Sequence, residues 1–184
     1  AVGSVLGGEC AGEVVRVGAG VTTVAVGEAV MAMAPGSLAR YVTVPAHAVV
    51  RVPVGVSWEA AATLPIAFLT AVYALEERAQ IQAGERVLIH AATGGVGQAA
   101  LQVARRAGAE IWATASEGKW EVLRGLGVTH VMNSRTLAFA EEVRRETQGQ
   151  GVDLVLNSLR GEFTTQSLGL LRPGGRFLEI GIRD

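Results

Sequence analysis

Residues 86–105 read Arg-Val-Leu-Ile-His-Ala-Ala-Thr-Gly-Gly-Val-Gly-Gln-Ala-Ala-Leu-Gln-Val-Ala-Arg, and this stretch decides the fold of the second half of the chain. It predicts a buried β-strand at Val87–His90, a glycine turn at Thr93–Gly97 and an apolar helix over 97–107. Glycines let a backbone turn tightly and approach a phosphate closely, while a helix N-terminus offers free N–H groups and a partial positive charge. We therefore expect the pyrophosphate of a dinucleotide to bind at Thr93, Gly94, Gly95, Val96 and Gly97.

The alternating strands and helices predicted after the glycine cluster strengthen its interpretation as a dinucleotide site. Its spacing, Ala-Ala-x-Gly-Gly-x-Gly from Ala91, matches the general G-x-G-x-x-G pattern only loosely, so a turn without a ligand is the alternative. Further apolar strands are predicted at 111–115, 130–133, 153–157 and 176–180, with helices at 118–125, 137–147 and 162–171. This alternation indicates a doubly wound parallel sheet, which binds ligands at the carboxyl ends of its strands.

The end of the second of these strands indicates which nucleotide binds. An NAD site usually has an Asp or Glu about 20 residues after the first glycine, where it bonds to the ribose 2′-OH. Here that position falls at Thr114–Ser116, and Glu117 comes slightly later, followed by Lys119. A small hydroxyl group at Ser116 with a nearby cation favours a 2′-phosphate and hence NADP(H). The alternative for Lys119 is an ordinary solvated residue.

A second candidate cation follows the third strand. Arg135 lies in Asn133-Ser-Arg-Thr136, where it could meet the same phosphate. The alternative is that Ser134 or Thr136 caps the next helix and that Arg135 only marks its start.

Residues 1–56 have a different pattern, in which valine-rich runs alternate with glycine and proline. The runs lie at 13–17, 29–33, 39–44 and 48–52, and they predict an antiparallel, barrel-like β unit. Ser57 is placed to cap a short helix that Leu64-Pro65 interrupts, and Ile66–Arg78 predicts a second helix with an apolar face.

The composition argues against several classes of protein. The 184 residues suffice for one ordinary domain or parts of two, and 49% apolar residues supply a sizeable core. A net charge of −1 without a basic stripe argues against nucleic-acid binding. No apolar run reaches the length of a membrane span, and no signal peptide is recognisable. Cys10 is the one cysteine, which excludes an intrachain disulfide and fits a reducing compartment, so we expect a cytoplasmic protein.

The motifs together resemble a known family over essentially the whole chain. Leu6-Gly-Gly-Glu-Cys-Ala-Gly12, followed by Val14, Val17 and Gly18, resembles the barrel-domain signature of medium-chain dehydrogenases/reductases, and the run 87–97 resembles their quinone-reductase and enoylreductase branch. The enoylreductase domains of modular polyketide synthases and of animal-type fatty acid synthase are similar in Ala113-Thr-Ala-Ser116, Lys119-Trp120, Ser134-Arg-Thr-Leu137, Val155-Leu-Asn-Ser-Leu159 and Gly174-Gly-Arg-Phe-Leu-Glu-Ile-Gly181.

This resemblance implies an α/β protein with a Rossmann-type doubly wound parallel sheet, preceded by part of a GroES-like β-barrel. It places a partial GroES-like domain at 1–78 and an NADP(H)-binding domain at 79–184. The implied activity is an NADPH-dependent enoylreductase, which reduces the double bond of an enoyl thioester on the phosphopantetheine arm of an acyl carrier protein. Hydride goes from the nicotinamide to the β-carbon, and the enolate is then protonated at the α-carbon.

The resemblance also implies partners and site residues. Other synthase domains are expected in cis, a homodimer is allowed, and neither nucleic acid nor a membrane is expected. Besides the turn at 93–97, the cofactor-binding residues implied are Ser116, Lys119, Ser134 and Arg135 at the adenosine end, Asn157, Ser158, Leu159 and Gly181 toward the nicotinamide half, and Thr70 on the barrel side. For Thr70 the alternative is a helix hydroxyl bonded to a backbone carbonyl.

Two rival functions remain open from the sequence. One is a stand-alone NADPH-dependent quinone or enone reductase with the same fold and cofactor. The other is a non-catalytic nucleotide-binding or scaffolding module. Its support is a departure from the family pattern Gly-Lys-x-Asp-Ile-Arg-Asp, whose lysine is a proposed proton donor, because this chain reads Gly181-Ile-Arg-Asp184.

The resemblance further implies that the chain is a fragment. Family members have more β structure before Leu6 and return to the barrel after the fifth strand of the nucleotide domain. Those parts hold a tyrosine position linked to stereochemistry and an aspartate proposed to assist protonation. Either the Lys-x-Asp loop is missing from the residues at hand, or the protein lacks that lysine. We therefore assign no catalytic residue, and Arg183 and Asp184 do not take its place.

Zinc chemistry is not expected. Zinc-dependent relatives have a histidine where this chain has Gly8, and they use four closely spaced cysteines for a structural zinc, whereas Cys10 stands alone. The three histidines, His47, His90 and His130, show no ligand spacing, and we expect structural roles for His90 and His130.

Overall fold

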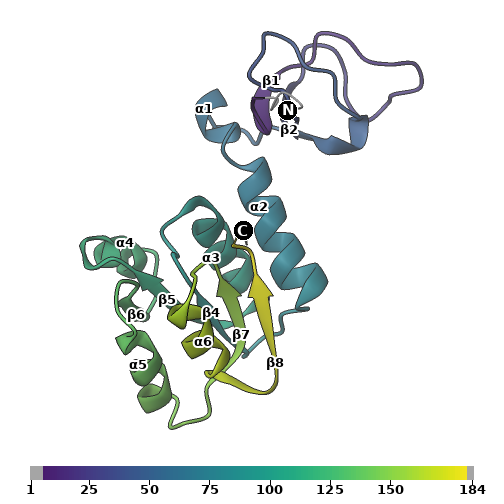
Figure 1. The fold of residues 1–184 in the computed structure, drawn as a ribbon. Helices are drawn as coiled ribbons and strands as arrows, with labels where there is room; N and C mark the ends of the chain where they lie inside the picture. Colours follow the sequence, from purple (N-terminus) through teal and green to yellow (C-terminus); the bar gives the residue numbers. More distant parts are fainter. Residues whose placement is uncertain (1–5, 182–184) are drawn as a thin grey trace, which may run out of the picture. The chain divides into compact units, whose positions relative to one another are not determined.

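The computed structural model describes residues 6–181, and the chain divides into two compact units between Leu69 and Thr70 (Figure 1). The division falls inside helix α2 (Pro65–Val72), upstream of the boundary after residue 78 that the sequence predicts. The residues that follow α2 therefore belong to the second unit by their contacts. Arg183 and Asp184 lie outside the described residues.

The second unit is built on a five-stranded sheet in the order β6-β5-β4-β7-β8, with every neighbouring pair parallel. Its strands are β4 (Arg86–Ile89), β5 (Glu110–Ala115), β6 (His130–Asn133), β7 (Val152–Asn157) and β8 (Leu171–Glu179). The order reverses at β4, because β5 and β6 lie on one side of it and β7 and β8 on the other. The predicted doubly wound sheet is confirmed, and its switch point is the place where such sheets bind ligands.

Helices connect these strands, and they differ from the predicted ones mainly at their ends. They are α3 (Gly95–Ala107), α4 (Trp120–Gly125), α5 (Ala138–Glu146) and α6 (Glu162–Leu168). The helix predicted over 118–125 is a 3₁₀ turn, η3 (Glu117–Lys119), followed by α4. The helix predicted over 162–171 is too long, because Gly169 caps α6 and Leu171 already pairs with Val152 in the sheet.

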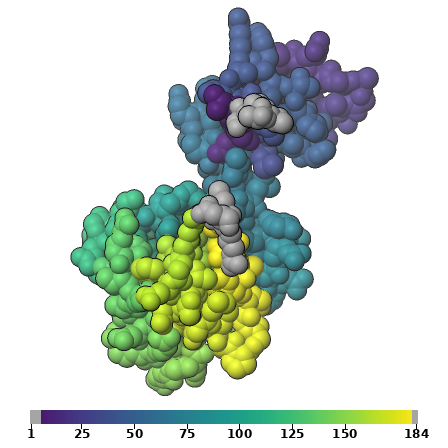
Figure 2. Space-filling model, viewed as in Figure 1, coloured from purple at the N-terminus to yellow at the C-terminus, as the bar shows by residue number. Residues whose placement is uncertain are grey.

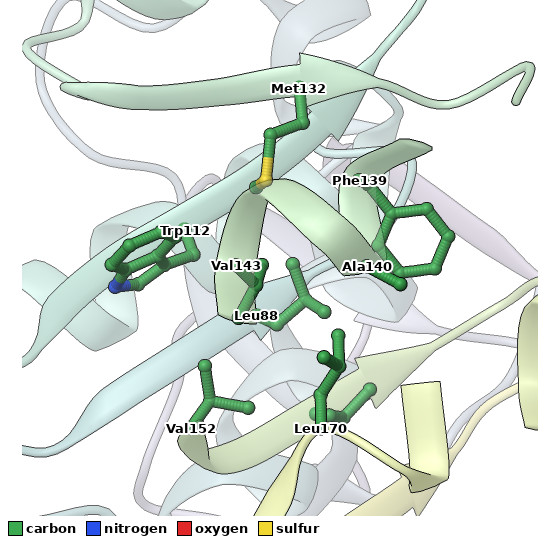
Figure 3. Close-up of a cluster of buried hydrophobic side chains, with 9 residues drawn as sticks. Leu88, Trp112, Met132, Phe139, Ala140, Val143, Val152 and Leu170 are labelled. Carbon is green, nitrogen blue, oxygen red and sulfur yellow. The ribbon is translucent and has the colours of Figure 1, made fainter. Parts of the chain in front are cut away.

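The core of this unit explains why its strands read as continuous apolar runs. Both faces of a parallel sheet are covered by helices, and all six residues of β7 are buried. One cluster joins strands β4 to β7 with α5 (Figure 3), and its buried members are Leu88, Trp112, Met132, Phe139, Ala140, Val143, Val152, Val155 and Leu170. In the space-filling view, side chains fill the gaps between the ribbons of this unit (Figure 2).

The first unit holds a three-stranded antiparallel sheet in the order β1-β2-β3. Its strands are β1 (Glu9–Glu13), β2 (Ala29–Met33) and β3 (Val49–Arg51), and a 3₁₀ turn, η1 (Ala46–Ala48), precedes β3. The strand predicted at 13–17 is wrong, because β1 ends at Glu13. The strand predicted at 39–44 is also wrong, since within residues 6–181 no neighbouring strand pairs with it, and Tyr41 is 65% exposed.

The helical stretch after the sheet begins as predicted. Ser57 accepts a hydrogen bond from the Ala60 N–H at 3.2 Å and so caps α1 (Trp58–Ala61). Pro65 then starts α2, where its missing N–H costs no helical hydrogen bond. The Glu9 carboxylate of β1 accepts the next N–H, that of Ile66, at 2.8 Å. A π-helical turn, η2 (Tyr73–Arg78), ends the stretch.

The sequence analysis expected no apolar segment as long as a membrane span, and one helical stretch does not meet this expectation. The helical stretch Trp58–Arg78, with 21 residues and a mean hydropathy of 1.4, is long and apolar enough to cross a membrane. A single stretch of this kind is weak evidence, because a core helix of a water-soluble protein passes the same test. Here the stretch consists of two separate helices and a π-helical turn.

Candidate functional site

The glycine turn lies directly after the central strand of the sheet. Beyond the end of β4, the His90 N–H still donates to the Leu156 carbonyl at 3.1 Å, so the chain stays paired up to the turn. Ala91 then adopts a left-handed backbone with φ +49°, and its carbonyl accepts the Gly94 N–H at 2.9 Å. For a residue with a Cβ this conformation costs about 1–2 kcal/mol, so the rest of the structure must hold it.

Helix α3 starts at this turn with its first N–H groups available. Its N-cap is Gly94, which has no side chain to accept a hydrogen bond from the first turn. The first N–H groups of a helix have no partner within the helix, and together with the helix dipole they attract an anion. The turn at Thr93–Gly97 therefore has the geometry of a phosphate site.

Gly97 brings α3 close to the strand end. A Cβ built on Gly97 would lie 2.5 Å from the Ala91 carbonyl oxygen and 2.6 Å from the Ala92 Cα. Both contacts are with backbone atoms, which cannot swing away as the end of a side chain can. Only glycine fits here, and this close approach sets where the N-terminus of α3 points.

Polar groups at the ends of β5 and β6 form a linked set. Asn133, the last residue of β6, donates from Nδ2 to Glu117 Oε1 at 2.8 Å, and its Oδ1 accepts the Arg135 N–H at 2.7 Å. The Ser134 N–H donates to the Ala115 carbonyl at 3.0 Å. The side chains of Lys119 and Arg135 are exposed and make no hydrogen bond or ion pair within residues 6–181.

This set corrects one expectation from the sequence and adds one residue that was not a candidate. Neither Ser134 nor Thr136 caps α5, because its N-cap is Leu137 and no side chain of the described residues bonds there. Sequence reasoning also missed Asn133, although a polar amide as the last residue of an apolar strand was the available signal. The acid near the ribose position, Glu117, is held by that amide.

The ends of β7 and β8 are joined by a second amide–carboxylate contact. Asn157 is fully buried, and its Nδ2 donates to Glu179 Oε2 at 2.9 Å and to the Leu159 carbonyl at 2.9 Å. Its Oδ1 accepts the Leu159 N–H at 3.2 Å, and Glu179 Oε1 accepts the Gly181 N–H at 2.8 Å. Asn157 thus shapes the loop that carries Ser158 and Leu159. The sequence analysis missed Glu179, which ends the fifth strand.

The strand-end candidates thus gather along one edge of the sheet, since carboxyl ends of parallel strands share an edge. Thr70 lies on α2 and is half-buried, and its hydroxyl makes no hydrogen bond within the described part of the chain. The alternative of a hydroxyl bonded to a backbone carbonyl is therefore not seen. Its part in a cofactor site stays a prediction.

Two histidines have structural surroundings, as expected from the sequence. His90 is 3% exposed and lies 3.0 Å from Thr114 Oγ1 and 2.7 Å from Ser167 Oγ, and burial lowers its pKa to about 4. His130 stacks on Trp112 with ring centroids 3.8 Å apart, and its Nδ1 lies 2.9 Å from Glu146 Oε2.

The residues around Gly8 do not fit a zinc ion. A Cβ on Gly8 would meet the Ile66 Cδ1 methyl at 3.1 Å, so an apolar group faces this position. Cys10 is half-buried on β1, and burial raises its pKa, which disfavours the thiolate that zinc binds. Within residues 6–181 no three His, Cys, Asp or Glu side chains are grouped to hold a metal.

Two family models match parts of the chain, and polyketide synthases are among its curated relatives. The alcohol dehydrogenase GroES-like domain family matches residues 1–54, and the zinc-binding dehydrogenase family matches residues 95–184. The pikromycin polyketide synthase component PikAII of Streptomyces venezuelae is 48% identical over 183 residues, which are 98% of this chain and 5% of that protein. The putative inactive phenolphthiocerol synthesis polyketide synthase type I Pks1 of Mycobacterium tuberculosis is 51% identical over 181 residues, which are 97% of this chain and 11% of that protein.

Solved structures are similar to the chain throughout. The CurK enoyl reductase matches with a TM-score of 0.91 at 54% identity, covering 96% of this chain and 54% of that one. The mycobacterial protein Rv1454c, solved in complex with NADPH, matches with a TM-score of 0.86 at 32% identity, covering 96% of this chain and 56% of that one. The chain spans about half the length of both structures. A Rossmann-type sheet with part of a GroES-like domain is thereby confirmed.

Proposed function

Because the chain belongs to the enoylreductase domains of polyketide synthases, within the medium-chain dehydrogenase/reductase superfamily, we propose that it acts as an NADPH-dependent enoylreductase. The observation that carries the proposal is the glycine turn that joins the central strand to α3, with Gly97 packed on the Ala91 carbonyl. The substrate is an α,β-unsaturated thioester on an acyl carrier protein, reduced during chain elongation.

When bound, NADPH would supply the hydride that adds to the β-carbon of the enoyl thioester, after which a proton adds at the α-carbon. The residues of this chain bind and orient that cofactor. The turn at Thr93–Gly97 holds the pyrophosphate through backbone N–H groups and the N-terminus of α3. None of the described residues is assigned as the proton donor.

The adenosine end supports a preference for the 2′-phosphate. Lys119 is the only lysine of the chain, and it lies with Arg135 among the residues that follow β5 and β6. Both cations are free of protein partners within the described residues, so neither must break an ion pair to meet a phosphate. Ser116 and Ser134 add hydroxyl groups at the same strand ends. The Glu117 carboxylate, which would repel a phosphate, is held by Asn133.

The nicotinamide half is proposed to lie at the ends of β7 and β8. Asn157 holds the loop of Ser158 and Leu159 through the N–H and the carbonyl of Leu159, and it also holds Glu179, whose other carboxylate oxygen accepts the Gly181 N–H. A Cβ on Gly181 would meet Glu179 Oε1 at 2.8 Å, so the Glu179 carboxylate lies against the backbone at this position. Thr70, on α2, is the remaining residue that we propose to contact the cofactor.

The relatives are multidomain synthases, and this supports a proposal about the partners of the chain and its place in a larger protein. We propose that other synthase domains lie in cis, that the acyl carrier protein delivers the substrate, and that the protein is cytoplasmic and able to form a homodimer. A stand-alone quinone or enone reductase would use the same cofactor. A non-catalytic nucleotide-binding module is the second candidate, because one relative at 51% identity is described as putatively inactive.

A fluorescence titration of this chain with NADPH, and in parallel with NADH, tests the proposal without any substrate. We expect NADPH to bind at least about tenfold more tightly, because one added ion pair at a partly desolvated phosphate contributes that much. Equal binding of the two cofactors would refute the assignment of the 2′-phosphate site. Folded protein that binds neither cofactor would refute the proposed cofactor site and favour a scaffolding module.

A further inference from the structure

A chain of buried hydrogen bonds runs from α6 through the sheet to the start of the glycine turn. Ser167, on α6, meets His90 after β4, and His90 meets Thr114 on β5. Thr114 in turn accepts the Ala91 N–H at 3.4 Å, a long and weak hydrogen bond. Thr114 and Ser167 have no exposed surface and His90 is 3% exposed, so these groups have no water to replace a lost partner.

The partners fix the direction of each hydrogen bond. The Ser167 hydroxyl donates its hydrogen to the Phe163 carbonyl at 2.7 Å, so Ser167 Oγ accepts from His90 Nε2. With its one proton on Nε2, a neutral His90 accepts at Nδ1, and the Thr114 hydroxyl donates there at 3.0 Å. The lone pairs of Thr114 Oγ1 then face the Ala91 N–H. The low pKa of His90, about 4, keeps the ring neutral in ordinary buffers.

This chain of hydrogen bonds ends at the residue on which the glycine turn is built. Ala91 has the left-handed φ of +49°, and its carbonyl accepts from Gly94 and lies against Gly97. The next residue is held as well, because the Ala92 N–H donates to the Thr114 carbonyl at 3.0 Å. Thr114 therefore binds two successive N–H groups of the turn, one with its hydroxyl and one with its backbone.

We propose that Thr114 is a positioning residue for the pyrophosphate turn, and that His90 orients its hydroxyl toward Ala91. The hydroxyl holds Ala91 in its left-handed conformation, and this conformation directs the N–H groups of the turn toward the phosphates. The effect on cofactor affinity rests on the proposed function, whereas the effect on the turn does not. Ser167 accepts the Nε2 proton of His90 and so leaves Nδ1 as the acceptor that faces Thr114.

Three variants separate positioning from simple loss of stability. Thr114→Val removes the hydroxyl and keeps the shape, and Thr114→Ser keeps the hydroxyl. Thr147→Val is the matched control, because it removes an equally buried hydroxyl that holds the Gly151 N–H at the opposite edge of the sheet. Each is measured in three ways: urea unfolding for global stability, hydrogen exchange of the Ala91–Gly97 amides in cofactor-free protein by NMR, and NADPH affinity. Exchange rates are compared under conditions in which the variant is fully folded.

We expect Thr114→Val to raise exchange in the turn and to weaken NADPH binding about five- to tenfold, because the hydroxyl loses its hydrogen bonds to both the Ala91 N–H and His90. Thr114→Ser restores both values to within about twofold of the original protein. Thr147→Val lowers global stability as Thr114→Val does, yet leaves turn exchange and NADPH affinity within about twofold.

Two outcomes overturn the proposal, and a third separates it from the proposed function. If Thr147→Val weakens NADPH binding as much as Thr114→Val, the effect is one of stability and not of positioning. If turn exchange is the same in Thr114→Val as in the original protein, Thr114 does not hold Ala91. If the original protein binds no NADPH while exchange behaves as expected, Thr114 positions the turn and the proposed cofactor is wrong.

Discussion

Asn133 holds the carboxylate of Glu117 across the ends of two neighbouring strands, with 2.8 Å between its Nδ2 and Glu117 Oε1. The same amide accepts the Arg135 N–H from its other side. One side chain therefore restrains an acid and orients the backbone of a cation at the edge where the adenosine is proposed to lie. An acid in this region usually favours NAD, so its restraint bears on cofactor choice.

Replacing Asn133 with Ala is expected to lower the preference for NADPH. The Glu117 carboxylate would be free to approach the ribose, where it repels a 2′-phosphate and accepts a hydrogen bond from a 2′-OH. We expect NADPH affinity to fall about five- to tenfold and NADH affinity to stay level or rise, measured by fluorescence titration. Adding Glu117→Gln to Asn133→Ala should restore most of the NADPH affinity. If it does not, Asn133 acts through Arg135 and not through the acid.

Replacing Lys119 and Arg135 together with Ala is expected to abolish the preference for NADPH. Each cation contributes a charge-assisted contact to the 2′-phosphate, so NADPH affinity should fall about 10- to 100-fold toward that of NADH. The same titration in rising salt should show that the original protein loses NADPH affinity faster than the variant does. Arg124→Ala is the control, because Arg124 is exposed but paired with Glu121. An equal loss in this control would point to net charge alone.

Gly97→Ala is expected to damage the turn, because the new Cβ would lie 2.5 Å from the Ala91 carbonyl oxygen. The N-terminus of α3 must move away from β4, which should cost about 1–3 kcal/mol of unfolding free energy and weaken NADPH binding at least about tenfold. Urea unfolding and cofactor titration measure the two effects. Gly125→Ala is the matched control, since nothing lies within 4 Å of its Cβ, and it should leave both values unchanged or raise stability slightly. A harmless Gly97→Ala would contradict the close approach.

The parallel sheet could be predicted from the sequence because its signals are local. Strands such as 130–133 carry short apolar runs that both faces of a covered sheet require, and glycines mark where strands give way to helices. The run at 39–44 has a similar composition but forms no strand. Whether an alternating run becomes a strand depends on a neighbour from another part of the chain, which composition does not specify.

The backbone part of the candidate site could be predicted for the same reason, whereas its side-chain contacts could not. The glycine turn is contiguous, and its glycines are visible in the sequence. Asn133 and Glu117 are 16 residues apart, Asn157 and Glu179 are 22 apart, and His90 and Ser167 are 77 apart. Such pairs meet only once strand order and helix placement are known. Asn157 and Lys119 could therefore be chosen as candidates. The partner of Asn157 could not be foreseen, nor could the finding that Lys119 has none among residues 6–181.

Glu85→Gln is expected to make the stability of the protein less sensitive to acid. Arg176 binds the Glu85 carboxylate at two points, with both nitrogen–oxygen distances 2.8 Å, and this hydrogen bonding lowers the pKa of Glu85 below its usual 4.5. A lowered pKa stabilises the fold at pH values above the unfolded pKa, and that stabilisation is lost as pH falls through the folded pKa. The Glu85 side chain is only 13% exposed, so the variant should lose about 2 kcal/mol at pH 7 and little at pH 3. Urea unfolding from pH 7 to pH 3 measures this, with the exposed Glu121→Gln as a control that should stay within about 0.5 kcal/mol. A loss that is equal at both pH values would mean that the introduced glutamine side chain fails to pack and that the ion pair contributes little.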